Sequence, residues 1–128
     1  MKKAEFYVRT KPSGLGMGNC KKTKVKGYCT DLSCGGLQFM LFNVNNQSTP
    51  KEKLRNMEHA NTGALWIVVE RNSGLDIDFG YTQKEAIENA ASTLAEWIDL
   101  YGVEHVVRQS EMYGSVENLP EYKENEEC

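Results

Sequence analysis

The segment from residue 64 to residue 102 constrains the fold more than any other, because two strands, a turn and a capped helix follow one another in it. The run ALWIVVE at 64–70 is apolar on both faces, which is typical of a central strand. The residues NSG at 72–74 favour a turn, and apolar and acidic residues then alternate from 75 to 79. This pattern predicts a β-hairpin. Its return strand has an apolar face and an acidic face, formed by Leu75, Ile77 and Phe79 and by Asp76 and Asp78.

A helix is expected directly after the hairpin. Thr82 and Glu85 have the spacing of a capping box, in which each side chain accepts a hydrogen bond from a backbone N–H at the helix start. Apolar residues then recur at helical spacing until Gly102, a favoured residue at a helix end. These residues are Ala86, Ile87, Ala90, Ala91, Leu94, Ala95, Ile98 and Tyr101. We expect a second, shorter helix from about Val103 to Glu111.

Three more strands are predicted before the hairpin. Residues 5–10 and 22–30 alternate between apolar and polar, and LQFMLFNV at 37–44 is apolar on both faces. A cap at Thr49 followed by proline predicts a short helix from about Pro50 to His59. The fold class expected is therefore α+β, an antiparallel sheet of about five strands followed by two C-terminal helices packed on it.

The chain has 128 residues, the usual size of one domain. It has no apolar run near the ~18 residues that span a bilayer, and its first ten residues lack the apolar centre of a signal peptide. We expect a cytoplasmic protein with no membrane partner.

The net charge of −3 hides an uneven distribution. Basic residues dominate positions 1–30, and acidic residues dominate positions 111–128. This division fits either a basic surface for an anionic partner or simply two solvated faces. We expect residues 1–114 to form a single domain and residues 115–128 to form an acidic, flexible tail.

Few residues in the chain have the arrangement that catalysis or metal binding requires. Cys20, Cys29, Cys34 and Cys128 contain no C-x-x-C pair, so we expect free thiols and no metal. His59 and His105 have no nucleophile signature beside them. We expect neither enzyme activity nor a cofactor.

Two other motifs have open interpretations. Asp76 and Asp78 could bind a divalent cation or act as an acid–base pair, or they could be solvated residues of a sheet face. The loop with Gly14, Gly16 and Gly18 could fold over a phosphate, although no phosphate-binding motif follows it.

The end of the hairpin is the candidate ligand site. Phe79 and Tyr81 flank Gly80 just before the helix start, where rings can stack on a base and backbone N–H groups attract phosphate. Asn89 could read a base edge, and Arg108 could pair with phosphate. In the alternative interpretation, Phe79 belongs to the core and Tyr81 packs on the helix as a hydrophobic staple.

With these residues assembled, the chain resembles a phage family, the Thoeris anti-defence family one proteins. The resemblance covers mainly WIVVERNSGLDIDFGYTQKEAIENA and the order of a sheet followed by two helices. It implies a non-enzymatic protein in the host cytoplasm that binds and sequesters a cyclic ADP-ribose isomer, a small anionic nucleotide. It also implies a homodimer or higher homo-oligomer. Phe79 and Asn89 match the family's base-holding residues, and Arg108 matches an arginine that contacts the rest of the ligand.

Two rival functions stay open. One is a phage or mobile-element inhibitor that binds a bacterial defence protein such as a CRISPR effector, with its acidic tail imitating nucleic acid. The other is a metal-dependent nuclease or phosphodiesterase that uses Asp76 and Asp78. We expect no binding of extended nucleic acid itself.

Overall fold

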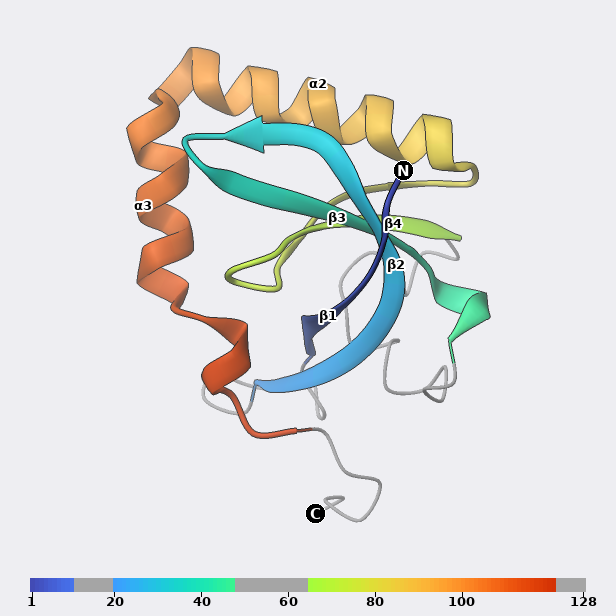
Figure 1. The fold of residues 1–128 in the computed structure, drawn as a ribbon. Helices are drawn as coiled ribbons and strands as arrows, with labels where there is room; N and C mark the ends of the chain where they lie inside the picture. Colours follow the sequence, from blue (N-terminus) through green and yellow to red (C-terminus); the bar gives the residue numbers. More distant parts are fainter. Residues whose placement is uncertain (11–19, 48–64, 122–128) are drawn as a thin grey trace.

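The computed structural model describes residues 1–10, 20–47 and 65–121, in which a five-stranded antiparallel sheet precedes two helices (Figure 1). This confirms the expected α+β class. The strands are β1 (Lys3–Thr10), β2 (Lys21–Cys34), β3 (Leu37–Asn43), β4 (Trp66–Glu70) and β5 (Asp76–Gly80); the helices are α2 (Gln83–Tyr101) and α3 (Val103–Tyr113), with short 3-10 helices η2 (Val44–Asn46) and η4 (Val116–Asn118). The expected helix at Pro50–His59 and the Gly14–Gly18 loop lie outside the described residues. In the described ranges, no helix has the length and apolarity needed to cross a bilayer.

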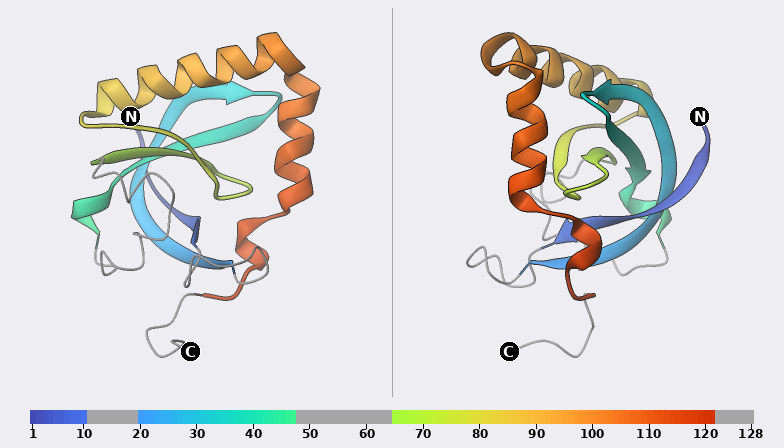
Figure 2. Two further views of the ribbon diagram at one scale, coloured as in Figure 1. Left: turned by 180° about the vertical axis from the view of Figure 1, so that it is seen from behind. Right: turned by 60° about the vertical axis from the view of Figure 1, so that its left-hand side comes forward.

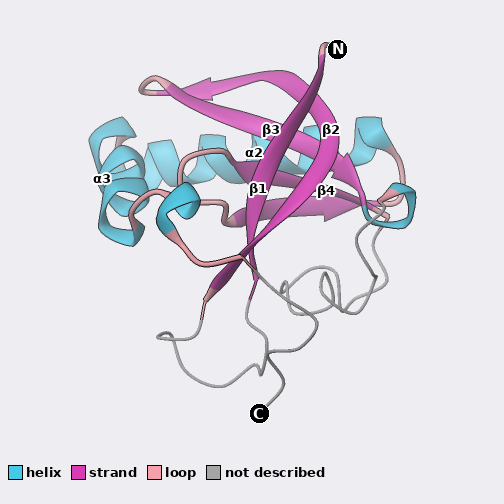
Figure 3. Cartoon of the chain, turned by 60° about the horizontal axis from the view of Figure 1, so that its bottom comes forward, coloured by secondary structure: helices cyan, strands magenta, loops and turns pink. Residues whose placement is uncertain are grey.

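The sheet is a meander that curls, because β2 is bent (Figures 1 and 3). Cys29 pairs with Met40 and Ser33 with Gln38, so β2 advances four residues while β3 advances two. At this irregularity the Thr30 hydroxyl donates to the carbonyl of Phe39 at 2.8 Å. Extra residues in one strand bend it and increase its twist. Because of this bend, β1 and the first half of β2 curve round toward the β4–β5 turn, where the N–H of Arg9 donates to the carbonyl of Gly74.

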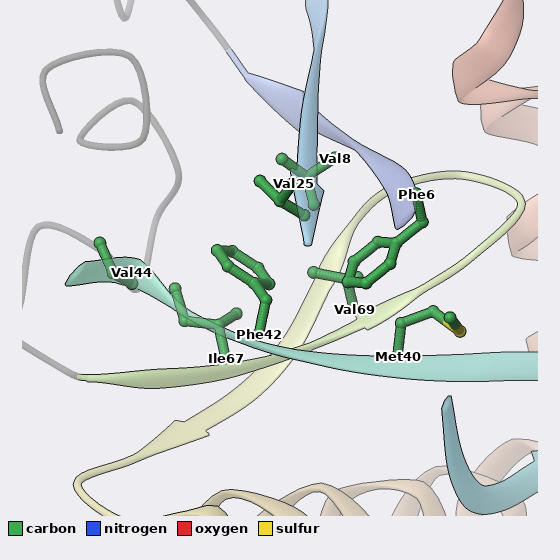
Figure 4. Close-up of a cluster of buried hydrophobic side chains, with 8 residues drawn as sticks. All are labelled: Phe6, Val8, Val25, Met40, Phe42, Val44, Ile67 and Val69. Atoms are coloured by element: carbon green, nitrogen blue, oxygen red, sulfur yellow. The ribbon is translucent and has the colours of Figure 1, made fainter. Parts of the chain in front are cut away.

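The inner face of the curl encloses one hydrophobic cluster, drawn in Figure 4. Phe6 and Val8 point into it from β1, which confirms the alternation read from that strand. Phe6 meets Phe42 edge to face, with 6.1 Å between ring centroids. The buried members of this inner cluster are Phe6, Val8, Val25, Met40, Phe42, Val44, Ile67 and Val69.

Helix α2 covers the side of β4 and β5 that faces away from the inner cluster (Figure 2). Its buried residues Ala86, Ala90 and Leu94 are small near the helix start, which allows a close approach. At Gly80 a Cβ atom would lie 2.5 Å from the backbone nitrogen of Ala86. Glycine is therefore needed at this position because strand and helix touch there.

The faces predicted for the return strand are wrong beyond Asp76, because β5 contains a bulge. Val68 pairs with Asp78 and Val69 with Asp76, so Ile77 is an extra residue. Successive residues of a regular strand alternate between faces, and one extra residue reverses the order. Ile77 consequently packs with the α2 cluster, whereas Phe79 packs against the inner cluster.

One side chain joins three distant parts of the chain. The Arg9 guanidinium donates to the carbonyl oxygens of Ser73 at 2.9 Å and Tyr113 at 3.1 Å. The backbone N–H of Arg9 also donates to the carbonyl of Gly74. The end of β1 is thus bound to the β4–β5 turn and to the last residue of α3, where a positive charge complements the helix dipole.

The folded domain continues beyond residue 114, which corrects the expected boundary. Val116 is buried, and its backbone N–H donates to the carbonyl of Asn72 at 2.7 Å. Gly74, with φ of 70°, leaves room for it, since a Cβ there would lie 2.7 Å from Val116 Cγ2. Further along, the backbone of Glu121 forms an isolated parallel β-bridge with that of Lys22, whose N–H donates to the carbonyl of Pro120 at 2.9 Å. Residues 122–128 of the expected tail lie outside the described range.

We expect Val116→Ala to lower the free energy of unfolding by about 1–3 kcal/mol, because it empties a filled apolar position. Removal of residues 115–128 should destabilise the domain further, whereas removal of 122–128 keeps every described contact. Urea unfolding measures both effects. The control is Glu96→Ala on α2, whose side chain is exposed, with an expected change within about 0.5 kcal/mol. Equal stability of the chains ending at residues 114 and 121 would contradict this packing.

Candidate functional site

Three of the four predicted ligand residues lie together where β5 meets α2. Tyr81 is exposed, with 59% of its surface accessible. Phe79 is half-buried against the inner cluster. The Asn89 amide donates to the carbonyl of Phe79 at 2.9 Å. Asn89 therefore ties the helix to the strand, which occupies one of its amide hydrogens.

The start of α2 has the capping arrangement that the sequence predicted. The Thr82 hydroxyl accepts from the N–H of Glu85 at 3.1 Å, and the Glu85 carboxylate accepts from the N–H of Tyr81 at 3.3 Å. Two backbone donors at this end are thereby used by the protein itself. The carboxylate also complements the positive end of the helix dipole. The helix start by itself is thus a weak attractor for phosphate.

Arg108 lies far from these three residues. It is exposed on α3, which begins only after the 19 residues of α2. A helix of that length extends roughly 28 Å. Arg108 lines a shallow depression with Gly35, Val103 and Glu111 beyond the far end of α2. One copy of the chain therefore does not bring Arg108 to Phe79 and Asn89.

The two aspartates of β5 are separated by the bulge residue Ile77 and have different surroundings. Asp76 pairs with Val69 of the inner cluster, and Asp78 pairs with Val68 of the α2 cluster. The Asp78 carboxylate accepts a hydrogen bond from the Thr93 hydroxyl at 2.6 Å and a second from the N–H of Phe79. Asp78 thus fastens α2 to the sheet. Among the described residues, no group of three or more His, Cys, Asp or Glu could hold a metal ion.

A groove of about 520 Å³ lies between β1, β2, η2 and the first residue of β4, one strand away from the junction of β5 and α2. Trp66 connects the groove with that junction, because it pairs with Asn43 of β3 on one side and with Gly80 of β5 on the other. The rings of Trp66 and Tyr28 form a tilted pair with centroids 6.5 Å apart. The lining consists of Lys3, Ala4, Glu5, Lys26, Gly27, Tyr28, Asn43, Asn46, Gln47 and Trp66. We call this the Trp66 groove.

The rim of the Trp66 groove has a positive excess. Among the described residues that line it, Glu5 is the one acid, and its carboxylate lies 3.3 Å from Lys24 Nζ and 3.9 Å from Lys26 Nζ. Lys3 adds a further cation to the lining. These charges are solvent-exposed, so they attract an anion through a screened field rather than through a buried pair.

One wall of the Trp66 groove is held in place by Gln47. Its side-chain amide accepts from the N–H of Lys26 at 2.8 Å and donates to the carbonyls of Lys26 and Asn43. This amide thus joins η2 to the edge of β2. The groove has a volume within the range of small-molecule sites and combines aromatic rings with a few polar groups.

Sequence reasoning missed the Trp66 groove because its residues come from four separate stretches of the chain. Trp66 was read only as part of a buried strand, and Lys26 and Tyr28 only as members of an alternating one. A usable signal was present, since an aromatic residue with a polar edge at the end of a strand favours a half-exposed position.

The chain was compared with protein-family models, with curated proteins and with solved structures, and none of them matches it.

Cys29 and Cys34 are free thiols, and burial raises the pKa of Cys34. A raised pKa means less thiolate at a given pH, so Cys34 should react slowly with iodoacetamide at neutral pH. Cys29, which is only half-buried, should react first. Peptide mass spectrometry after timed alkylation measures the order, with unfolded protein as the control for intrinsic reactivity. Equal rates in the folded protein would contradict the burial of Cys34.

Proposed function

We propose that this protein binds a small anionic nucleotide, a cyclic ADP-ribose isomer, and sequesters it without converting it. In this role it would act in the cytoplasm of the host cell as a phage anti-defence protein. The observation that carries the proposal is the Trp66 groove, where a ring pair and lysines meet beside the start of α2. The order of a sheet followed by two helices agrees with the family that the sequence resembles.

Each part of the Trp66 groove suits one part of such a ligand. The rings of Trp66 and Tyr28 offer a surface for a base, and stacking of a base on an aromatic ring contributes about 1–3 kcal/mol. Lys3 and Lys26 would attract the phosphates as point charges. Asn46 offers an amide with both a donor and an acceptor for a base edge or a ribose hydroxyl.

The residues predicted from the sequence keep a place in this proposal. Tyr81 is exposed and follows Gly80, which pairs with Trp66, so its ring can contact a ligand that extends toward α2. Asn89 and Phe79 support that edge through their mutual hydrogen bond. Arg108 would reach the same ligand only from a second copy of the chain, which the expected homo-oligomer allows.

Sequestration depends on mass action rather than on turnover. The protein must outnumber the signal, and its dissociation constant must lie below the signal concentration that activates the host effector. Differences in affinity between related complexes reside mostly in the dissociation rate. A slow release of intact nucleotide is therefore the property to measure.

Incubation with cyclic ADP-ribose isomers followed by heating should release the intact nucleotide, detected by chromatography and mass spectrometry. Trp66→Leu, which keeps an apolar side chain but removes the ring, should weaken binding about tenfold, in line with the loss of one stacking partner. Lys3→Glu with Lys26→Glu should weaken it further and most strongly at low salt. Phe79→Ala and Asn89→Ala, measured in the same assay, test whether the ligand also contacts the junction of β5 and α2.

The charge control is Arg71→Glu, because Arg71 is exposed at the opposite end of β4. Thermal unfolding of each variant separates loss of binding from loss of fold. A cleaved product, or no retained nucleotide, would refute sequestration. Intact nucleotide from every variant would keep the function and place the ligand outside the Trp66 groove.

Exposed apolar side chains favour contact with another macromolecule. Large ones are accessible at the end of α2 and on α3, among them Leu100, Val103 and Met112. A second copy of the chain is the partner that the sequence resemblance implies. The alternative function, inhibition of a bacterial defence protein such as a CRISPR effector, would use the same side chains.

We expect the wild-type protein to be a dimer or a larger homo-oligomer in light scattering after size-exclusion chromatography. Met112, which is 73% exposed, should lie in or near the contact, so Met112→Glu should shift the assembly toward the monomer. Ser92→Glu, an exposed position on α2, serves as the matched control and should change nothing. A monomeric wild-type chain would instead favour a host protein as the partner.

A further inference from the structure

A second cavity, of about 250 Å³, lies at the other end of the molecule from the Trp66 groove. It is enclosed by the β4–β5 turn, the last turns of α2, and α3. We call it the Glu70 cavity. Its lining is largely apolar and aromatic, and its polar members come mainly from the turn and from α3. Those used below are Glu70, Ser110, Trp97, Tyr101, His105 and Tyr113.

Glu70 is a buried carboxylate with only 3% of its surface exposed. Its oxygens accept hydrogen bonds from the N–H groups of Asn72 and Ser73 and from the Ser110 hydroxyl. All three donors are uncharged. Within the described ranges Glu70 forms no ion pair, because the nearby Arg9 guanidinium is directed at the carbonyls of Ser73, Tyr113 and Gly114.

A carboxylate offers about four acceptor positions, and these donors fill three of them. A buried charge without a counter-charge is costly, so a cation in the same cavity would stabilise it. No Lys or Arg occurs among the described residues that line the cavity. The charge of the cavity is therefore complementary to a positive ligand and opposes an anionic one.

The aromatic walls fit the same kind of ligand. Trp97 lines the cavity from α2, and the Tyr101 ring lies against the His105 ring with centroids 4.9 Å apart. Tyr113 closes the side formed by the end of α3. Aromatic faces attract organic cations through the quadrupole of the ring, and several rings around one site form a cage for ammonium groups.

From this geometry we propose that the Glu70 cavity binds a small organic cation, an amine or quaternary ammonium compound with a compact apolar body. The ammonium group would lie near Glu70 and the rings would surround the apolar part. The inference is independent of the Trp66 groove, which has the opposite charge and lies at the opposite end of the sheet. A protein with both sites would bind an anionic and a cationic small molecule at once.

Choline is a suitable probe, and 3,3-dimethyl-1-butanol is its uncharged counterpart with the same shape. Titration of the full-length protein by calorimetry, or by NMR shifts of the Trp97 indole, should show saturable binding of choline. The uncharged alcohol should bind at least tenfold more weakly. The ratio isolates the contribution of charge, since shape and apolar area are the same.

Two variants locate the site. Glu70→Gln removes the charge but keeps the size, and Tyr101→Leu removes a ring whose side chain is 61% exposed and thus not needed for folding. Each should weaken choline binding at least tenfold. Glu111→Gln removes an equal charge from an exposed position of α3 outside the cavity, and should leave binding unchanged.

Thermal unfolding must accompany the titrations, because Glu70 also binds the β4–β5 turn. If Glu70→Gln fails to fold, Tyr101→Leu and the uncharged alcohol still decide the question. Equal binding of choline and 3,3-dimethyl-1-butanol would overturn the proposal. So would the absence of choline binding at millimolar concentration, or full binding by a folded Tyr101→Leu variant.

Discussion

The contacts of Arg9 hold the domain in its curled form. Five strands of a meander do not close by themselves, because β1 and the β4–β5 turn are at opposite edges of the strand order. The Arg9 guanidinium and backbone join that turn to β1 and to the end of α3. Hydrogen bonds to a charged group are stronger than neutral ones. These bonds hold the turn and the end of α3 against β1, and η4 packs on β1 and β2 with Val116 buried.

The same curl separates two places with opposite properties. At the end where α2 begins, β1 and β2 bring lysines beside the half-buried rings of Tyr28 and Trp66. At the end where α2 turns into α3, the β4–β5 turn presents the buried Glu70 carboxylate to a set of aromatic rings. The lysines at the first site attract negative charge, whereas the buried Glu70 carboxylate at the second repels it.

Sequence reasoning located the junction of β5 and α2 as a candidate site, but it did not identify the side chains of the Trp66 groove. Thr82 and Glu85 predicted the helix start correctly, because capping is a local interaction between residues three apart. Phe79 was predicted to share a face with Ile77 and does not, because the bulge at Ile77 depends on pairing with β4 and leaves no local signature. Asn89 has a structural hydrogen bond that its sequence context did not reveal. The binding roles of Phe79, Tyr81, Asn89 and Arg108 stay predictions.

Local periodicity and capping in the sequence were enough to establish the number and order of the strands, both helices and the α+β class, since each depends on neighbouring residues. Tertiary structure alone decided which faces meet, how far the domain extends, and where polar groups gather. Val116 was assigned to a flexible tail by composition, yet it is buried because Gly74 leaves space for it. Contacts between residues distant in the chain have no local pattern, and both cavities are built from such contacts.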